Sequence, residues 1–462
     1  MNVIKKFIGD KKFYKSLFLI VIPIVLQQFI TQFVALLDNL MVGSVGNDEM
    51  IGVSLANQLL FVFNLGIFGS LSGAAIFATQ YFGAKDKEGY QETMRFKFLI
   101  GISIFLIALF ILIIFDDQLL KAFINSSDGE YSNPDVVLSC GKEYLRLMLI
   151  GLLPFVIKEI YATSLREMRE TFVPMLSGVV AICVNLVVNA VLIFGLLGFP
   201  KLGIIGAAIG TIASRFVEML IVVVYANVKV KKFPFFSGVF SKAIIKAKSF
   251  KRFLPITLLL LSNEVFWSLG LTMILQSYSY RGLDVVGAMN ICNTVNNVFV
   301  TVGTSLGNAT AIILGNLLGA KKYDEAKSSS YKILFASFAF STIVALIEIG
   351  ASFIIPNIYN TSDGIKLMAR ELIIIASVFL PFHAFNTCCY FTLRAGGKMI
   401  LTILFDSLFI WAVRLPIAFF LSKYTTISIL IVFALADGID AVKVIAGYIL
   451  VDKGIWIKKV ID

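Results

Sequence analysis

The sequence predicts an all-α polytopic membrane protein with twelve transmembrane helices in two six-helix lobes. Of its 462 residues, 58% are hydrophobic and 15% are charged, whereas soluble domains contain roughly 25% charged residues. The apolar residues form runs of about 20 residues or more, the length at which an α-helix crosses a bilayer. A pattern near residue 80 also recurs near residue 316. Composition, run length and repeat together predict a membrane protein made of two related halves.

Twelve segments have the length and apolar character of a membrane span. We expect the transmembrane helices at residues 16–41, 51–80, 94–115, 138–164, 172–195, 203–226, 254–280, 286–315, 331–355, 367–393, 399–422 and 427–450. Pro23 predicts a kink in the first of these helices.

The repeat is a Gly-Ala-Lys pattern that ends the second and the eighth apolar segments. Its copies are Gly83-Ala84-Lys85 and Gly319-Ala320-Lys321, an offset of 236 residues, and the same offset aligns Asn57 with Asn293. Membrane chains whose halves repeat each other are typical of transporters.

Loop charges predict the orientation of the chain. Lysine and arginine dominate the N-terminus, the tail and the connector 227–252, whereas the alternate loops carry acids such as Asp116 and Asp117. By the positive-inside rule both termini are cytoplasmic, which requires an even number of spans. We therefore expect a multi-pass protein of the cell membrane.

The basic connector 227–252 divides the repeats into an N-terminal lobe, 1–226, and a C-terminal lobe, 253–462. Each lobe has six spans, so both have the same orientation, and we expect a pseudo-twofold axis along the membrane normal. We expect the connector to be a tether attracted to lipid headgroups. The alternative is a short helix on the inner leaflet.

The net charge of +11 does not indicate nucleic acid, because the basic residues lie in short loops between apolar segments. We expect small-molecule substrates and the lipid bilayer as partners, no nucleic acid, and a monomer.

The first span carries a polar stripe. Gln28, Gln32 and Asp38 lie on one helical face. An ionisable group at bilayer depth costs at least about 2.5–3.5 kcal/mol. The stripe therefore predicts the wall of a water-accessible cavity that binds a cation. The alternative is a structural polar seam between helices.

Three further residues complete the predicted cation site. Asn185 and Asn189 lie four residues apart in the fifth span, and Thr211 lies in the sixth. With Asp38 they offer enough oxygen donors for Na⁺, or a hydrogen-bonded niche for a proton. Each asparagine could instead hold two helices together.

In the second half, Glu264, Ser268 and Thr272 lie at successive i+4 positions of the seventh span. The amides of the eighth span indicate a wet cavity rather than a lipid-facing surface. The candidate cavity-lining residues are Gln28, Gln32, Asn57, Asn290, Asn293 and Asn297.

Further charges lie in the last two spans. We expect Arg414 to pair with Asp406, Asp437 or Asp440 as a structural ion pair rather than to act in transport.

The chain has no phosphate-binding Gly-Lys loop, no metal-ligand motif and no nucleophile elbow. We therefore expect no enzyme activity and no cofactor. A pump of this composition would draw its energy from an ion gradient.

These residues resemble the multidrug and toxic compound extrusion (MATE) family. The resemblance covers essentially the whole chain and includes the two Gly-Ala-Lys patterns. Its other motifs are Asp38-Asn39-Leu40-Met41-Val42-Gly43, Leu165-Arg166, Leu393-Arg394-Ala395-Gly396-Gly397, Gly206-Ala207-Ala208-Ile209-Gly210-Thr211 and Asn263-Glu264-Val265-Phe266-Trp267-Ser268-Leu269-Gly270.

The resemblance implies a V-shaped pair of six-helix lobes that export lipophilic, often cationic compounds in exchange for H⁺ or Na⁺ by alternating access. It assigns cation binding to Asp38, Asn185, Asn189 and Thr211, and a coupling acid to Glu264. Asn189 stands where well-known members have an aspartate, which leaves the coupling ion open. The alternatives are a flippase for lipid-linked oligosaccharide and an exporter of one dedicated metabolite.

Overall fold

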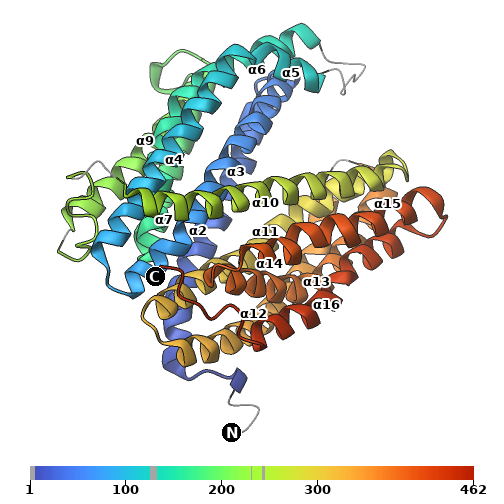
Figure 1. The fold of residues 1–462 in the computed structure, drawn as a ribbon. Helices are drawn as coiled ribbons and strands as arrows, with labels where there is room; N and C mark the ends of the chain where they lie inside the picture. Colours follow the sequence, from blue (N-terminus) through green and yellow to red (C-terminus); the bar gives the residue numbers. More distant parts are fainter. Residues whose placement is uncertain (1–5, 125–132, 230, 242–244, 360, 462) are drawn as a thin grey trace. The chain divides into compact units, whose positions relative to one another are not determined.

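The structure, a computed structural model, describes residues 6–124, 133–229, 231–241, 245–359 and 361–461 (Figure 1). These residues form helices and no strand. The long helices are α2 (Lys11–Gly43), α3 (Asn47–Gly83), α4 (Lys87–Ile114), α8 (Phe172–Phe194), α9 (Ile204–Val228), α10 (Ala247–Ser279), α11 (Leu283–Gly319), α12 (Tyr323–Ser352), α13 (Asp363–Ala395) and α16 (Ile429–Asp452). Shorter helices are α5 (Asp116–Ile124), α6 (Pro134–Met148), α7 (Leu152–Glu167), α14 (Met399–Ile403) and α15 (Leu415–Tyr424). The predicted all-helical fold is confirmed.

Ten helical segments of the described chain are long and apolar enough to cross a membrane. The other two predicted spans are also helical. The fourth, 138–164, is broken by a tight turn at Leu149–Gly151 into α6 and α7. The twelfth, 427–450, is α16, whose middle carries Asp437, Asp440 and Lys443. α16 is long enough to cross a membrane, and the three charged residues in its middle distinguish it from the ten other helical segments.

The eleventh predicted span contains an irregular stretch. Between α14 and α15 the backbone forms two successive π-helical turns, Leu404–Leu408 and Ile410–Arg414. π-helical turns inside helices are rare and often lie at functional sites. Asp406 and Arg414 lie on these turns.

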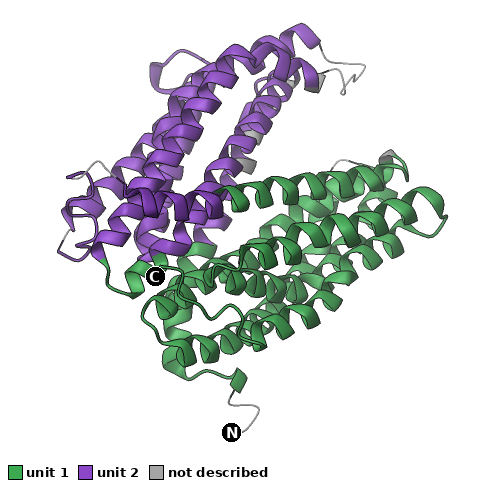
Figure 2. Cartoon of the chain, viewed as in Figure 1, with its two compact units in different colours: residues 1–25, 79–86, 258–462 green, residues 26–78, 87–257 purple. Residues whose placement is uncertain are grey.

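The chain divides into two compact units (Figure 2). Unit 1 comprises residues 1–25, 79–86 and 258–462, and unit 2 comprises residues 26–78 and 87–257. Three helices pass from one unit to the other, and the passages in α2 and α10 lie close in sequence to Pro23 and Pro255. The lobe boundaries at 226 and 253, which follow the predicted spans, stay a prediction.

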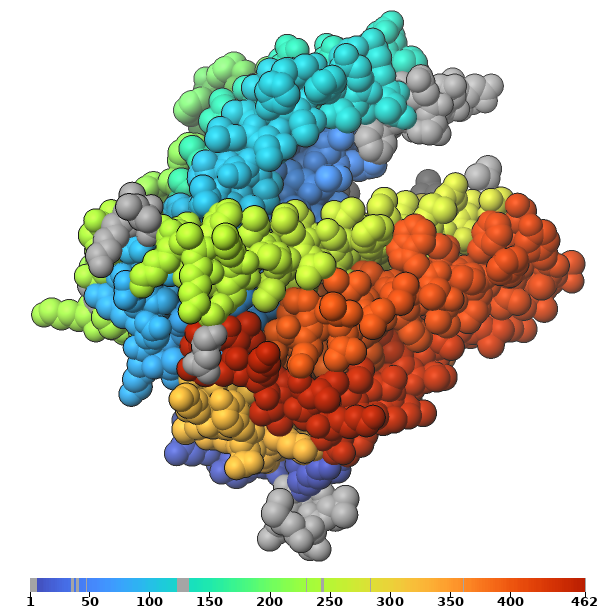
Figure 3. All heavy atoms as spheres, viewed as in Figure 1, coloured from blue at the N-terminus to red at the C-terminus, as the bar shows by residue number. Residues whose placement is uncertain are grey.

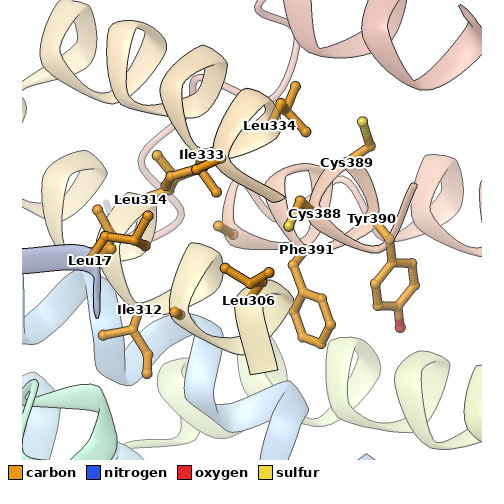
Figure 4. Packing of buried hydrophobic residues seen from close by; sticks show 14 of the residues in the cluster. Leu17, Leu306, Ile312, Leu314, Ile333, Leu334, Cys388, Cys389, Tyr390 and Phe391 are labelled. Carbon is orange, nitrogen blue, oxygen red and sulfur yellow. The ribbon is translucent and has the colours of Figure 1, made fainter. Parts of the chain in front are cut away.

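The core of unit 1 joins α11, α12 and α13. Leu306, Leu334 and Cys388 from these three helices gather in one cluster with Leu17 of α2 (Figure 4). Figure 3 shows the face of unit 1 formed by α14, α15 and α16, where side chains of neighbouring helices lie against one another. Large apolar side chains such as Ile445 point outward from this unit, as lipid-facing residues do.

Within unit 2 the described part of the connector is packed, and the expectation that it is a tether attracted to lipid headgroups stays a prediction. Phe233 and Phe236 are each 5% exposed, and the ring of Phe236 stacks on Tyr161 with 5.7 Å between centroids. Gln91 Nε2 donates to the Ser237 carbonyl at 2.6 Å. Aromatic burial therefore holds the described part of the connector against α4 and α7.

The two copies of the Gly-Ala-Lys pattern pack against each other within unit 1. A Cβ at Gly83 would collide with the backbone of Asn316, and a Cβ at Gly319 would collide with the backbone of Gln80. Residues 80 and 316 are equivalent positions of the repeat, as are 83 and 319, so the contact is reciprocal. Glycine is required because the two backbones touch.

Both copies also end in the same turn. Lys85 and Lys321 have left-handed φ values of 58° and 59°. The N–H of Asp86 donates to the Tyr81 carbonyl at 2.9 Å, and that of Lys322 donates to the Leu317 carbonyl at 3.0 Å. Such a bond across six residues closes a helix end. The prediction that the pattern ends both helices is confirmed.

Gln80 ties this contact to the rest of unit 1. Its buried amide donates to the Ala395 carbonyl at 3.0 Å and to the Lys458 carbonyl at 3.3 Å, and its oxygen accepts from the Val460 N–H at 2.6 Å. The end of α3 thus holds the end of α13 and the segment after α16.

We predict that Gly319→Ala destabilises the protein by about 1–3 kcal/mol, because the added methyl must push α11 away from α3. Thermal unfolding of the purified protein in detergent measures the effect. The matched control is Gly350→Ala on α12, where a Cβ meets open space. Equal melting temperatures for the two variants would refute the reciprocal contact.

Candidate functional site

The predicted cation site lies in unit 2, where α2, α8 and α9 meet. Asn189 Nδ2 donates to Asp38 Oδ1 at 2.8 Å and to Asn185 Oδ1 at 3.3 Å. Asn185 Nδ2 in turn donates to Thr211 Oγ1 at 3.4 Å. The four side chains therefore form one chain of hydrogen bonds. Their role in cation binding stays a prediction.

Asn189 is the most enclosed member of this site. Its side chain is 0% exposed, and a Cβ at Gly210 would collide with its amide oxygen. That oxygen has no hydrogen-bond donor among the described residues. The amide nitrogen of Asn189 contacts the Asp38 carboxylate, whereas this oxygen lies against Gly210 of α9. A buried amide oxygen without a donor is uncommon in folded proteins.

Sequence reasoning missed Tyr144 on α6. Its side chain is 5% exposed, and its hydroxyl interacts with Thr211 and with Asn57 of α3. Tyr144 therefore adds a hydroxyl to the edge of the Asp38 site. A single tyrosine in an apolar segment gives no sequence signal for such a contact.

The other predicted cavity residues divide between the units. Gln28, Gln32 and Asn57 belong to unit 2, and Asn290, Asn293 and Asn297 belong to unit 1. Gln28 and Asn293 are half-buried, and the remaining four are exposed. Polar side chains on the outside of a membrane helix require water or a partner. Their role as cavity lining stays a prediction.

A second polar group in unit 2 surrounds Arg166 of the Leu-Arg motif. The guanidinium donates to Gln27 Oε1 at 3.0 Å and lies 4.0 Å from the Glu159 carboxylate. Lys158 pairs with Glu159 at 2.5 Å and with Glu218 at 3.4 Å. These charges neutralise one another within the unit, as buried charges must.

In unit 1, Glu264 lies in a buried network beside Arg394 of the second Leu-Arg motif. Arg394 Nη1 lies 3.8 Å from Glu264 Oε1, and the Tyr390 hydroxyl donates to the same oxygen at 3.4 Å. Both Leu-Arg motifs thus place an arginine beside a glutamate of their own unit.

Asn263 extends this network to a second carboxylate. Its Nδ2 donates to the Tyr390 hydroxyl at 3.3 Å and to Asp406 Oδ2 at 3.2 Å. The Ser407 hydroxyl donates to Asn263 Oδ1 at 2.7 Å. Asp406 on the first π-helical turn is therefore linked to Glu264, a connection that sequence reasoning did not anticipate.

Arg414, on the second π-helical turn, pairs with Asp437 of α16. The predicted pairing of Arg414 is confirmed, with Asp437 as its acid, and its structural role stays a prediction. Asp406 does not pair with Arg414 and instead belongs to the hydrogen-bond network of Glu264. No group of three or more His, Cys, Asp or Glu side chains that could hold a metal ion occurs in the described part of the chain.

We predict that Asn263→Leu destabilises the protein by about 1–3 kcal/mol, because it removes the donor to Asp406 and the acceptor for Ser407 in a buried site. Thermal unfolding measures the loss. Asn227→Leu, at an exposed position of α9, is the matched control. A melting temperature for Asn263→Leu equal to that of the control would contradict the network.

Comparison with known proteins shows which family this chain belongs to. The family model MatE matches residues 23–191 and 259–420. The probable multidrug resistance protein YoeA of Bacillus subtilis is 25% identical over 90% of this chain and 89% of its own length. The probable multidrug resistance protein NorM of Bacillus cereus is 22% identical, over 89% of this chain and 88% of its own length.

Solved structures share the fold. A multidrug resistance MATE family transporter in an outward-facing conformation has a TM-score of 0.83 with 17% identity, over 98% of this chain and 99% of that chain. A mutant of the Vibrio cholerae MATE transporter VcmN has a TM-score of 0.85 with 16% identity, over 97% of this chain and 98% of that chain. The matched family model spans both units, so this chain belongs to the MatE family and is a multi-pass membrane transporter.

Proposed function

We propose that this transporter is a secondary active antiporter that exports lipophilic, often cationic small molecules in exchange for H⁺ or Na⁺. Family membership supports export of small molecules, since relatives are named as multidrug resistance proteins. The observation that carries the ion coupling is the chain of hydrogen bonds that joins the Asp38 carboxylate to the uncharged oxygen-bearing side chains Asn189, Asn185 and Thr211.

The charge of the site limits the charge of the ion that it can bind. Asp38 is the only acidic side chain among the four that form the site, and its partners Asn185, Asn189 and Thr211 are uncharged. One negative charge is balanced by one H⁺ or one Na⁺, whereas a divalent ion would leave an excess positive charge in a membrane-embedded site. We therefore expect a monovalent coupling ion.

The mechanism follows from differential affinity. A cation that enters from outside binds at Asp38 and reorganises the hydrogen bonds of α2, α8 and α9. Drug and cation favour opposite facing states, so the inward movement of one drives the outward movement of the other. We place both termini in the cytoplasm, in line with the basic loops.

The central prediction concerns Asp38→Asn. In proteoliposomes loaded with a fluorescent lipophilic cation, we expect this variant to lose gradient-driven export by at least tenfold, because the amide cannot bind the ion as a carboxylate does. Asp363→Asn, a fully exposed residue at the start of α13, is the matched control. Wild-type rates in Asp38→Asn would rule out the site.

A second prediction tests the single charge. Asn189→Asp places another carboxylate beside Asp38, and two adjacent carboxylates hold a cation more tightly. We expect the apparent affinity for the coupling ion to rise at least threefold. Export measured under separately imposed H⁺ and Na⁺ gradients identifies the ion. An unchanged ion dependence in Asn189→Asp would show that the ion does not bind beside residue 189.

A further inference from the structure

Glu348 is the most unusual carboxyl group in unit 1. It lies on α12, one turn before the helix ends at Ser352. The side chain is 0% exposed. Neither carboxylate oxygen has a hydrogen-bond donor among the described residues. Every other buried acid considered above has a donor or a cation beside it.

The side chains that face Glu348 do not form a hydrogen bond with its carboxyl group in the described structure. α12 packs against α11, α13 and the short turn Ile355–Ile358. From α13, Ser377 faces Glu348, but its hydroxyl donates to the Ile373 carbonyl at 2.7 Å. The single hydroxyl hydrogen of Ser377 is therefore used within α13 and is not donated to Glu348.

The titratable and charged groups on the packed elements do not neutralise Glu348. From α11 the facing group is the thiol of Cys292, which is 1% exposed. On α13, the Arg370 guanidinium lies 5.2 Å from the centre of the Phe353 ring, and neither Glu348 oxygen has a hydrogen-bond partner among the described residues. Glu371, also on α13, is an acid and cannot supply a positive charge. The turn Ile355–Ile358 contains no charged residue.

An ionised carboxylate in this position would be buried without a counter-charge or a donor, which costs several kcal/mol. The neutral acid avoids that cost, because it carries no charge that needs a donor or a counter-charge. Sodium fits poorly, because Ca²⁺- and Na⁺-type sites need several oxygen ligands and the facing group on α11 is a thiol. The geometry matches a carboxylic acid.

We propose that Glu348 is a proton-binding site of unit 1, which holds its proton in this conformation and releases it when the end of α12 is hydrated during transport. Release converts the carboxylic acid into a carboxylate and one H⁺, with no other reactant. The proposal goes beyond the Asp38 site, lies in the other unit, and does not depend on which ion couples to export.

Infrared difference spectroscopy on the full-length protein in lipid tests proton binding. Subtracting the spectrum of Glu348→Gln from that of the wild type at neutral pH should leave the carbonyl band of a protonated carboxylic acid, which shifts in D₂O. The matched control is Glu325→Gln, an exposed residue paired with Lys322, whose subtraction should leave the bands of an ionised carboxylate. A carboxylate difference for Glu348 would overturn the proposal.

A second variant keeps the test decisive if Glu348→Gln does not fold. Glu348→Met removes the carboxyl group but keeps the length of the side chain. A neutral acid in apolar surroundings is replaced by methionine with an unchanged or higher melting temperature, and the same band is lost from the spectrum. A fall in melting temperature as large as that of Gly319→Ala would show that the carboxylate has a stabilising partner, and would overturn the proposal.

Proton release is tested in proteoliposomes. Export by the wild type should change with external pH more steeply than export by Glu348→Gln, by at least twofold over one pH unit. Identical pH profiles would overturn release. If the wild type does not export the dye, the proposed function fails, whereas the infrared result still decides whether Glu348 binds a proton.

Discussion

The contact on which unit 1 depends is the meeting of two glycine-containing helix ends. Gly83 lies on the backbone of Asn316 and Gly319 lies on the backbone of Gln80, so each copy of the repeat is the other's partner. Reciprocal contacts of this kind are the signature of a local twofold relation. The backbones of Lys85 and Lys321, two residues after each glycine, adopt the same left-handed conformation. The two copies of the duplicated pattern therefore bind each other within one chain through equivalent residues.

The two units share the Leu-Arg motif but differ in the surroundings of their acidic side chains. Each Leu-Arg motif positions an arginine beside a glutamate, Arg166 with Glu159 and Arg394 with Glu264. Two further carboxylates have different surroundings: Asp38 of unit 2 donates nothing and accepts from an amide, and Asp406 of unit 1 lies on a π-helical turn. The repeat therefore keeps an arginine beside a glutamate in both units, whereas Asp38 and Asp406 have different surroundings.

Local features of the fold could be predicted from the sequence, because hydropathy reports on each segment by itself. The spans, the helix ends at the Gly-Ala-Lys patterns and the grouping of Asn185 with Asn189 all follow from spacing along one helix. The link from Glu264 to Asp406 could not be predicted, since it depends on Asn263 and on the rotation that the π-helical turns give to Asp406. Tyr144 and the donor-free state of Glu348 likewise depend on which helix packs opposite.

The bonds of Gln80 have a consequence for the order in which the chain assembles. Its partners Ala395, Lys458 and Val460 lie 315, 378 and 380 residues later in the sequence. At roughly 5–20 residues per second, the ribosome reaches them about 16–76 s after it has made Gln80. During that interval the end of α3 carries an unsatisfied amide at a surface that will later be buried. The first copy of the repeat is thus synthesised early, but the hydrogen bonds of Gln80 form only after Val460 has been made. Until then, water or the insertion machinery must satisfy the Gln80 amide.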